Sequence, residues 1–243
     1  LLPLSLILAW GGISCCSIKN SEIPNRSGLR PHHSFLYIEI RNVKKVCQNG
    51  LCYEALYSSA GSGFAISPLG EDHTLGVTAG HVCEVPEGDI NKSITATSYG
   101  GEKHKVSVIS LYGDTDTCLI AVFNTRVPPL PIADSPILPG DKVMALGAPL
   151  GIHDVNMVAM FDGYFSGPAA RIPHAASSDG ELELSGYTVP ARPGSSGGPV
   201  LNMRGEVVGM VSLAHPSFET FALSPRQEEF SLVLQAALRA ATR

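Results

Sequence analysis

The feature that most restricts the fold of this chain is the repeated interruption of short apolar segments by turn-forming residues. Of its 243 residues, 25 are glycine and 18 are proline. This density of glycine and proline favours short strands joined by turns over a helical bundle or a coiled coil. Strand-length segments rich in valine, isoleucine, leucine and phenylalanine lie at 35–40, 63–67, 75–79, 107–111, 118–123, 142–147, 199–201 and 206–213. Their spacing predicts an all-β sandwich or barrel fold.

A proline-rich stretch near the middle of the chain divides the predicted strands into two groups. Residues 126–136 cannot form a central strand, because proline has no N–H to donate to a neighbouring strand. We therefore predict two β units of similar size, one over 34–126 and one over 127–243, with a tether over 19–33 before them.

One helix is predicted at the C-terminal end of the chain. Ser224 is expected as its N-cap and Pro225 as its first residue, with Gln227 three residues after the cap. The apolar residues that follow share one helical face: Phe230, Val233, Leu234, Ala237 and Leu238. We expect this helix to brace the fold and not to carry a functional site.

The N-terminal segment has the pattern of an export signal. Residues 1–18 carry no charged side chain and are followed by a polar stretch, as in a secretory signal with its processing site, although a buried strand or helix is the alternative. Residues 12–15 resemble a bacterial lipobox with Cys15 as the lipid-bearing residue, a pattern from which Gly12 departs. No later apolar run reaches the ~20 residues needed to span a bilayer. We expect an exported protein that is secreted, periplasmic or lipid-anchored, with no membrane span in the mature chain.

Two pairs of cysteines differ in their expected state. Cys47 and Cys52 flank an Asn-Gly turn signal, which places them opposite each other in a hairpin. Because export permits disulfides, we predict a Cys47–Cys52 bridge, with two unpaired thiols as the alternative. Cys83 and Cys118 lie in apolar stretches, and we interpret them as buried free cysteines. The alternative is a disulfide between these two residues.

Net charge and ligand spacing narrow the possible partners. The formal net charge is −5, so the chain lacks the positive surface of a general nucleic-acid binder. The sequence has no C-x-x-C pair, no H-E-x-x-H motif and no zinc-ligand spacing, and we predict no metal site.

Three residues with complementary chemistry occur in the order His81, Asp116 and Ser196. A serine hydroxyl is a weak nucleophile that needs a base within hydrogen-bond reach, and a histidine held by a carboxylate provides one. Asp116 is preferred to Asp114 because it lies nearer to the apolar segment that follows. The glycine-rich loop around Ser196 suits an oxyanion hole formed by the backbone N–H groups of Gly194 and Ser196.

Five segments together resemble the chymotrypsin-like serine peptidases, and the HtrA-type proteases most closely. They are 61–67 (GSGFAIS), 78–81 (TAGH), 116–120 (DTCLI), 140–151 (GDKVMALGAPLG) and 193–202 (PGSSGGPVLN). The resemblance implies two six-stranded antiparallel β-barrels, with the catalytic triad in the cleft between them. It also implies an endopeptidase that acts on proteins or peptides without a cofactor or a metal ion.

The same resemblance suggests which residues contact the substrate. Ser212, Leu213 and Ala214 match the short strand that pairs with the substrate backbone. Pro190 matches the residue at the base of the pocket for the residue N-terminal to the cut. Because Pro190 is uncharged, we expect a preference for small or medium aliphatic residues there. An inward-turned Arg192 would favour acidic residues instead.

Two other functions compete with this interpretation. Residues 194–198 also fit the G-x-S-x-G motif of α/β-hydrolases, but no aspartate follows Ser196 as that fold requires. The remaining alternative is a peptidase-like module that binds peptides without cleaving them. Such a module would keep the three residues of the triad but lack the formed oxyanion hole that cleavage requires.

Overall fold

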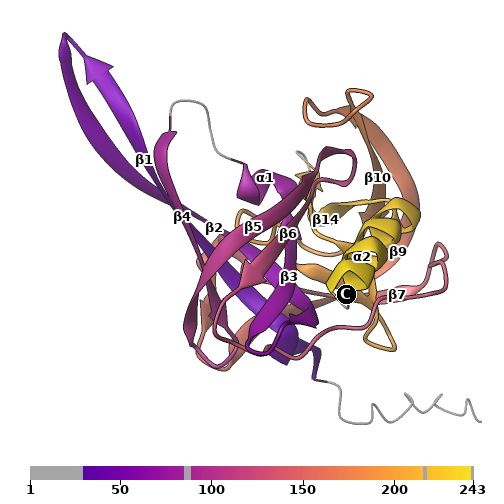
Figure 1. Cartoon of the computed structure of the whole chain (residues 1–243). Helices are drawn as coiled ribbons and strands as arrows, with labels where there is room; N and C mark the ends of the chain where they lie inside the picture. Colours follow the sequence, from indigo (N-terminus) through magenta and orange to yellow (C-terminus); the bar gives the residue numbers. More distant parts are fainter. Residues whose placement is uncertain (1–29, 85–88, 216–217, 242–243) are drawn as a thin grey trace, which may run out of the picture.

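The computed structural model describes residues 30–84, 89–215 and 218–241. The predicted export signal over 1–18, the lipid-bearing Cys15 and most of the tether over 19–33 lie outside these residues. The described chain begins with η1 (Pro31–Ser34). Two β units follow (Figure 1), and a C-terminal helix contacts strands of both.

The first unit is a closed barrel of six antiparallel strands. They are β1 (Phe35–Gln48), β2 (Leu51–Leu69), β3 (His73–Ala79), β4 (Asp89–Ser98), β5 (Lys103–Tyr112) and β6 (Thr117–Val122). The strand order is β1-β2-β3-β6-β5-β4, and β1 closes the barrel by pairing with both β2 and β4. Leu36, Ile38 and Ile40 alternate along β1 and are buried in the interior, as expected for a strand with one face on the core.

Strands β1 and β2 continue beyond the barrel as a two-stranded arm (Figure 1). Its turn is formed by Asn49 and Gly50, with φ of 53° and 80°. Positive φ at both positions is what a two-residue hairpin turn requires. Cys47 and Cys52 are paired in the register, and a disulfide joins them.

The second unit is one large antiparallel sheet. Its strands are β7 (Lys142–Gly147), β8 (His153–Asp154), β9 (Met157–Pro173), β10 (Glu181–Tyr187), β11 (Pro199–Asn202), β12 (Val207–Met210), β13 (Leu213–His215) and β14 (Phe218–Pro225). The order is β12-β11-β7-β9-β10-β14-β13, and β8 pairs with β9. The prediction of a second closed six-stranded barrel is not confirmed for this unit, because β12 and β13 end the sheet and no ladder joins them among the described residues.

Side-chain hydroxyls take the place of a strand ladder where the sheet approaches closure. The Met210 amide donates to Ser224 Oγ at 3.0 Å, and the Tyr187 hydroxyl donates to the Val208 carbonyl at 3.1 Å. A hydroxyl that satisfies a buried backbone group removes the need for a strand partner at that point. These side-chain hydrogen bonds connect β12 to β14 and to β10, although no ladder joins them among the described residues.

The C-terminal helix α2 (Gln227–Ala241) packs against a core that includes residues of both units. Phe230, Leu234 and Ala237 are its buried apolar residues, in agreement with the predicted face. The predicted start of the helix is wrong. Strand β14 runs through Pro225, and Ser224 uses its hydroxyl within the sheet instead of capping the helix.

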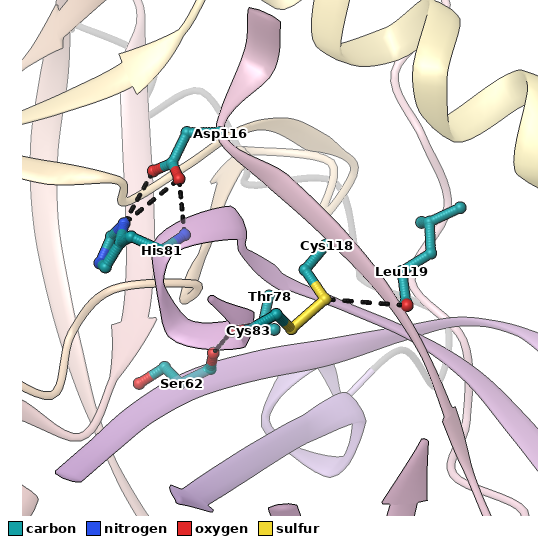
Figure 2. Close-up of a disulfide and its surroundings, with 7 residues drawn as sticks. All are labelled: Ser62, Thr78, His81, Cys83, Asp116, Cys118 and Leu119. Carbon is teal, nitrogen blue, oxygen red and sulfur yellow. Dashed lines mark hydrogen bonds and ion pairs between the residues drawn. A yellow bond between two sulfur atoms is a disulfide. The ribbon is translucent and has the colours of Figure 1, made fainter. Parts of the chain in front are cut away.

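A disulfide links Cys83 and Cys118 (Figure 2), so the interpretation of these residues as free thiols is wrong. Cys83 ends the short helix α1 (Gly80–Cys83), and Cys118 lies in β6. Both are buried in the barrel core, where two small apolar side chains and a bridge are equally compatible with the sequence. The pairing of β3 with β6 brings the segments that carry them together.

Loss of the Cys83–Cys118 bridge is expected to destabilise the chain by about 4 kcal/mol, because a bridge that closes a long loop restricts the unfolded chain strongly. The two cysteines are separated by 35 positions, against 5 for Cys47–Cys52. The short loop should contribute about 2 kcal/mol at most. Urea unfolding of the two double cysteine-to-alanine variants measures the difference. Equal losses in both variants would contradict this expectation.

Candidate active site

His81 and Asp116 meet at the ends of two paired strands. His81 follows β3 in helix α1, and Asp116 immediately precedes β6, which pairs with β3. Nδ1 of His81 lies 2.9 Å from Oδ2 of Asp116, and the His81 amide donates to Oδ1 at 2.9 Å (Figure 2). The Gly80 amide also donates to the Asp116 carbonyl at 2.7 Å. The carboxylate therefore fixes both the ring and the backbone of the histidine.

Local geometry explains the residues around this pair. Asp116 has a φ of 41°, in the left-handed region that aspartate tolerates better than most residues. It follows the single turn η2 (Gly113–Thr115), which turns the chain into β6. A side chain at Gly80 would lie 2.9 Å from Asp116 Oδ1, so this position has room only for glycine.

The Asp116 carboxylate is 1% exposed and is also held from the second unit. The Ser212 hydroxyl donates to Asp116 Oδ2. Burial raises the pKa of Asp116, but the hydrogen bonds and charge of His81 and the Ser212 hydroxyl outweigh it and lower the pKa below its usual value. Asp116 is therefore stabilised in its charged form as a partner for the histidine.

The interaction between His81 and Asp116 shifts the pKa of the histidine in the opposite direction. Burial lowers the pKa of His81, but its hydrogen bond to Asp116 and the negative charge of that carboxylate outweigh burial and raise the pKa overall. The ring thus keeps a proton to higher pH than an isolated imidazole.

An NMR titration of the His81 ring checks this shift. We expect a midpoint above the ordinary histidine value of 6.5, because Asp116 stabilises the imidazolium. In Asp116→Asn the midpoint should fall below that of the native chain, since the carboxylate that raises the pKa of His81 is gone and only the charge of Glu84 still opposes burial. A native midpoint below 6.5, or one unchanged in Asp116→Asn, would contradict the expectation.

Asp114, the other candidate carboxylate, faces a different part of the molecule. Its Oδ1 accepts from the Ser178 amide at 2.6 Å and from the Ser177 hydroxyl at 3.0 Å. These hydrogen bonds lower the pKa of Asp114. Asp114 therefore stabilises the turn before β10 and has no recorded contact with His81 among the described residues.

The loop that carries Ser196 forms hydrogen bonds with residues of both units. The Ser62 amide of β2 donates to the Ser196 carbonyl at 2.7 Å, and the Gly197 amide donates to the Val211 carbonyl at 2.7 Å. Gly197 has a φ of 89°, and a side chain there would lie 2.1 Å from the Ser62 carbonyl oxygen and 2.9 Å from the Ala79 amide. Glycine at this position lets the loop approach β2 and the end of β3, next to His81.

The Ser196 hydroxyl donates to the Ser212 carbonyl at 3.2 Å. No hydrogen bond between Ser196 and His81 is recorded in the described part of the chain. The structure thus joins His81 to Asp116 directly and connects Ser196 to them through Ser212, whose hydroxyl binds Asp116 and whose carbonyl accepts from Ser196.

The backbone of the loop orients two amides that the sequence predicted as donors. The Pro193 carbonyl accepts from the Leu150 amide at 2.6 Å, and the Ser195 carbonyl accepts from the Gly198 amide at 2.9 Å. In a trans peptide the N–H points away from the carbonyl of the same group. The next amides, those of Gly194 and Ser196, therefore point away from these bonds. Neither has a recorded protein acceptor among the described residues, which leaves both available to a bound oxygen.

The residues predicted to contact substrate surround this loop. Leu213 and Ala214 lie in β13, which ends the sheet and pairs only with β14 within the described sheet. Its other edge is therefore open to an extended peptide. Pro190 is half-buried and Arg192 is exposed, both in the segment between β10 and β11.

Two roles were not predicted. Ser212 was expected only as a strand residue, yet its hydroxyl holds Asp116. Ser62 was noted only as part of the segment 61–67 on which the resemblance rests, yet it binds the Ser196 loop. In both cases the only signal is a serine in a buried stretch, and its partner lies far away in the sequence.

Among the described residues, no group of three or more histidine, cysteine, aspartate or glutamate side chains is arranged to hold a metal ion. Within the same residues, no helix has the length and apolar character to cross a membrane.

Residues 61–210 match the model of a family described as a trypsin-like peptidase domain. A probable periplasmic serine endoprotease, DegP-like, of Chlamydia pneumoniae is 32% identical over 62% of this chain and 28% of its own length. The serine protease Rv3671c of Mycobacterium tuberculosis is 30% identical over 72% of this chain and 39% of its own length. The chain thus spans well under half of either curated relative.

Solved structures share the fold. The active form of the M. tuberculosis protease Rv3671c superposes with a TM-score of 0.62 at 22% identity, covering 83% of this chain and 79% of that one. The HtrA-type protease AlgW with a decapeptide superposes with a TM-score of 0.63 at 15% identity, covering 86% of this chain and 66% of that one.

Proposed function

The chain belongs to the trypsin-like peptidase family, and we propose that it is a serine endopeptidase that cleaves proteins or peptides through His81, Asp116 and Ser196. Two observations support the chemistry beyond family membership. A buried carboxylate holds the histidine ring at 2.9 Å, and a glycine-rich loop presents the serine beside two unused amides.

In the proposed reaction, His81 takes the proton of the Ser196 hydroxyl as that oxygen attacks the carbonyl carbon of the peptide bond. Asp116 holds the ring by Nδ1, so that Nε2 faces the serine, and it stabilises the imidazolium that forms. His81 then protonates the leaving amine, and an acyl group remains on Ser196. A water molecule activated by His81 hydrolyses this ester and restores the serine.

The amides of Gly194 and Ser196 are proposed to bind the oxygen that becomes negative during attack. Donors already aimed at that position need no reorientation during the reaction, and losing one costs about 10²- to 10³-fold in kcat. Their hydrogen-bond capacity is unused within the described chain, which supports this role.

The single observation that carries the proposal is the shared contact at Ser212. Its hydroxyl binds Asp116 and its carbonyl accepts from Ser196, so the carboxylate, the ring and the serine are held around one residue. In the proposed reaction, the Ser196 hydroxyl leaves the Ser212 carbonyl and donates to the histidine ring. Such hydrogen bonds commonly align only once substrate is bound.

The same orientation of Ser196 also suits a module that binds peptides without cleaving them, since its hydroxyl is engaged away from the ring. Casein digestion with and without a serine-directed phosphonate separates the two functions. Cleavage that the phosphonate abolishes supports the peptidase. A folded chain that binds peptides but neither cleaves them nor reacts would support the binding module.

We propose that substrate pairs with the open edge of β13 and places an aliphatic residue against Pro190. The uncharged base of this pocket gives a basic side chain no counter-ion, which makes its burial costly. Profiling of cut sites with a peptide library tests this preference. Cleavage after alanine or valine supports it, whereas cleavage after aspartate or glutamate would assign the selectivity to Arg192.

An exported location is also proposed. Several DegP-like relatives are named periplasmic, and two disulfides in the described chain suit an oxidising compartment. Fractionation of expressing cells, followed by detection of the chain, tests this location.

A further inference from the structure

Ser62 is fully buried in β2 and contacts the proposed oxyanion loop at two points. Its hydroxyl donates to the Gly194 carbonyl at 2.7 Å, and its amide donates to the Ser196 carbonyl at 2.7 Å. Gly194 and Ser196 are the residues whose amides are proposed to bind the oxyanion. Ser62 of the barrel thus donates one hydrogen bond to the carbonyl oxygen of each of these two residues.

The orientation of the Ser62 hydroxyl is fixed by a second hydrogen bond. The hydroxyl accepts from the Ala148 amide at 3.0 Å, and Ala148 is itself buried. The Ser62 carbonyl accepts from Thr78 Oγ1 at 2.7 Å (Figure 2). Thr78 lies in β3, three residues before His81. The hydroxyl, amide and carbonyl of Ser62 therefore all have fixed partners, in a network that joins the loop to the strand carrying the histidine.

These bonds determine how the loop backbone is rotated. The peptide group that joins Gly194 to Ser195 is held at its oxygen by Ser62 and at its nitrogen by the Arg192 carbonyl, which accepts from the Ser195 amide at 2.8 Å. The Gly194 amide belongs to the peptide group before it, whose carbonyl is bound to Leu150. With both peptide groups fixed, Gly194 cannot rotate its N–H away from the oxyanion position without breaking a bond.

We propose that Ser62 is a positioning residue for the oxyanion hole, and that its hydroxyl keeps the Gly194 amide aimed at the reacting oxygen. This inference rests on the proposed peptidase function. Removal of the hydroxyl leaves a buried carbonyl and a buried amide without partners, a situation that drives local rearrangement. The rearrangement would fall on the loop, because Gly194 has the conformational freedom of glycine.

The test is Ser62→Ala in the full chain, with kcat and KM measured on a peptide substrate. We expect kcat to fall by about 10- to 100-fold, less than or comparable to the loss of one oxyanion donor, while KM changes less than about threefold. Affinity for a peptide trifluoromethyl ketone, whose adduct places an oxyanion in the hole, should fall by the same factor as kcat/KM. Ser62→Thr, which keeps the hydroxyl, should restore most of the rate.

Ser224→Ala is the matched control. Ser224 is also fully buried, and its hydroxyl likewise accepts from a backbone amide, that of Met210, and donates to a backbone carbonyl, that of Pro225. Ser224 makes no recorded contact with the loop in the described chain. Its variant should lose stability to urea as Ser62→Ala does, with kcat unchanged.

The outcomes distinguish a failure of the positioning role from a failure of the proposed peptidase function. A native-like kcat in Ser62→Ala, or an equal loss of kcat in Ser224→Ala, overturns the positioning role and leaves the peptidase proposal standing. A folded native chain without peptidase activity overturns both. If Ser62→Ala does not fold, Ser62→Cys, with a weaker hydrogen-bonding group of similar shape, is interpreted in the same way.

Discussion

Replacement of Ser196 by alanine is expected to lower kcat for peptide hydrolysis by about 10⁶-fold, and replacement of His81 by alanine is expected to cost about as much. The two residues act as a unit, because the hydroxyl attacks only when the ring accepts its proton. The double variant should therefore be little worse than either single one. Kinetics on a peptide substrate with at least millimolar solubility measure these losses.

Ser195→Ala is the control for this experiment. Ser195 is adjacent to Ser196 in the same loop, but its hydroxyl is buried and accepts from the Arg192 amide at 3.4 Å. We expect this variant to keep kcat within about tenfold of the native chain, as for loss of one weak buried hydrogen bond. A larger loss in Ser195→Ala than in Ser196→Ala would show that the nucleophile has been assigned to the wrong serine.

Asp116→Asn should lower kcat by about 10⁴-fold with little change in the fold. An asparagine amide donates where the carboxylate accepts, so it favours the ring tautomer with a proton on Nε2. That tautomer cannot take the proton of Ser196. The variant also loses the charge that stabilises the imidazolium, so both effects reduce the rate.

Asp114→Asn separates this effect from a general change near β6. Asp114 is held by the Ser177 and Ser178 groups and contributes to a surface turn. Its replacement should leave kcat within about twofold, since exposed polar substitutions seldom change stability by more than about 0.5 kcal/mol. A rate loss in Asp114→Asn that equals the loss in Asp116→Asn would contradict the assignment of the carboxylate.

The part of the fold predicted best from sequence is the barrel interior. Residues 35–40 and 75–79 have the apolar pattern of buried strands, and they lie in β1 and β3. The hairpin at Cys47 and Cys52 was predicted, but the continuous strand that joins it to residues 35–40 was not, because Arg41, Lys44 and Lys45 are exposed and polar. That arm is held by backbone pairing, by its Asn-Gly turn and by a disulfide, and only the last two leave a local signal.

Strands of the second unit were harder to recognise. The segments that form β9, β10 and β14 were not predicted, and they contain glycine, proline and serine within their strands. Whether the sheet closes into a barrel depends on pairing between strands that are far apart in the sequence. No single segment determines that pairing. The Ser224 hydroxyl illustrates the difficulty, because its sequence context indicates a helix cap while the fold uses it to bridge the sheet.

Some residues of the candidate site could be predicted from the sequence, whereas some of its contacts could not. His81, Asp116 and the Ser196 loop could be proposed from motifs and from their order, because each lies in a distinctive local sequence. The bond between Ser62 and Gly194 joins residues separated by 132 positions, and nothing near either residue predicts it. The Cys83–Cys118 bridge is a similar case, since burial alone does not distinguish two thiols from a disulfide.

The most direct test of the proposed chemistry is mass spectrometry of the folded native chain after incubation with a serine-directed phosphonate. One adduct per chain, located by peptide mapping on Ser196 and absent when His81 is replaced by alanine, is the predicted result. A folded chain that remains unmodified, or an adduct on a different residue, would contradict the proposed catalytic role of Ser196.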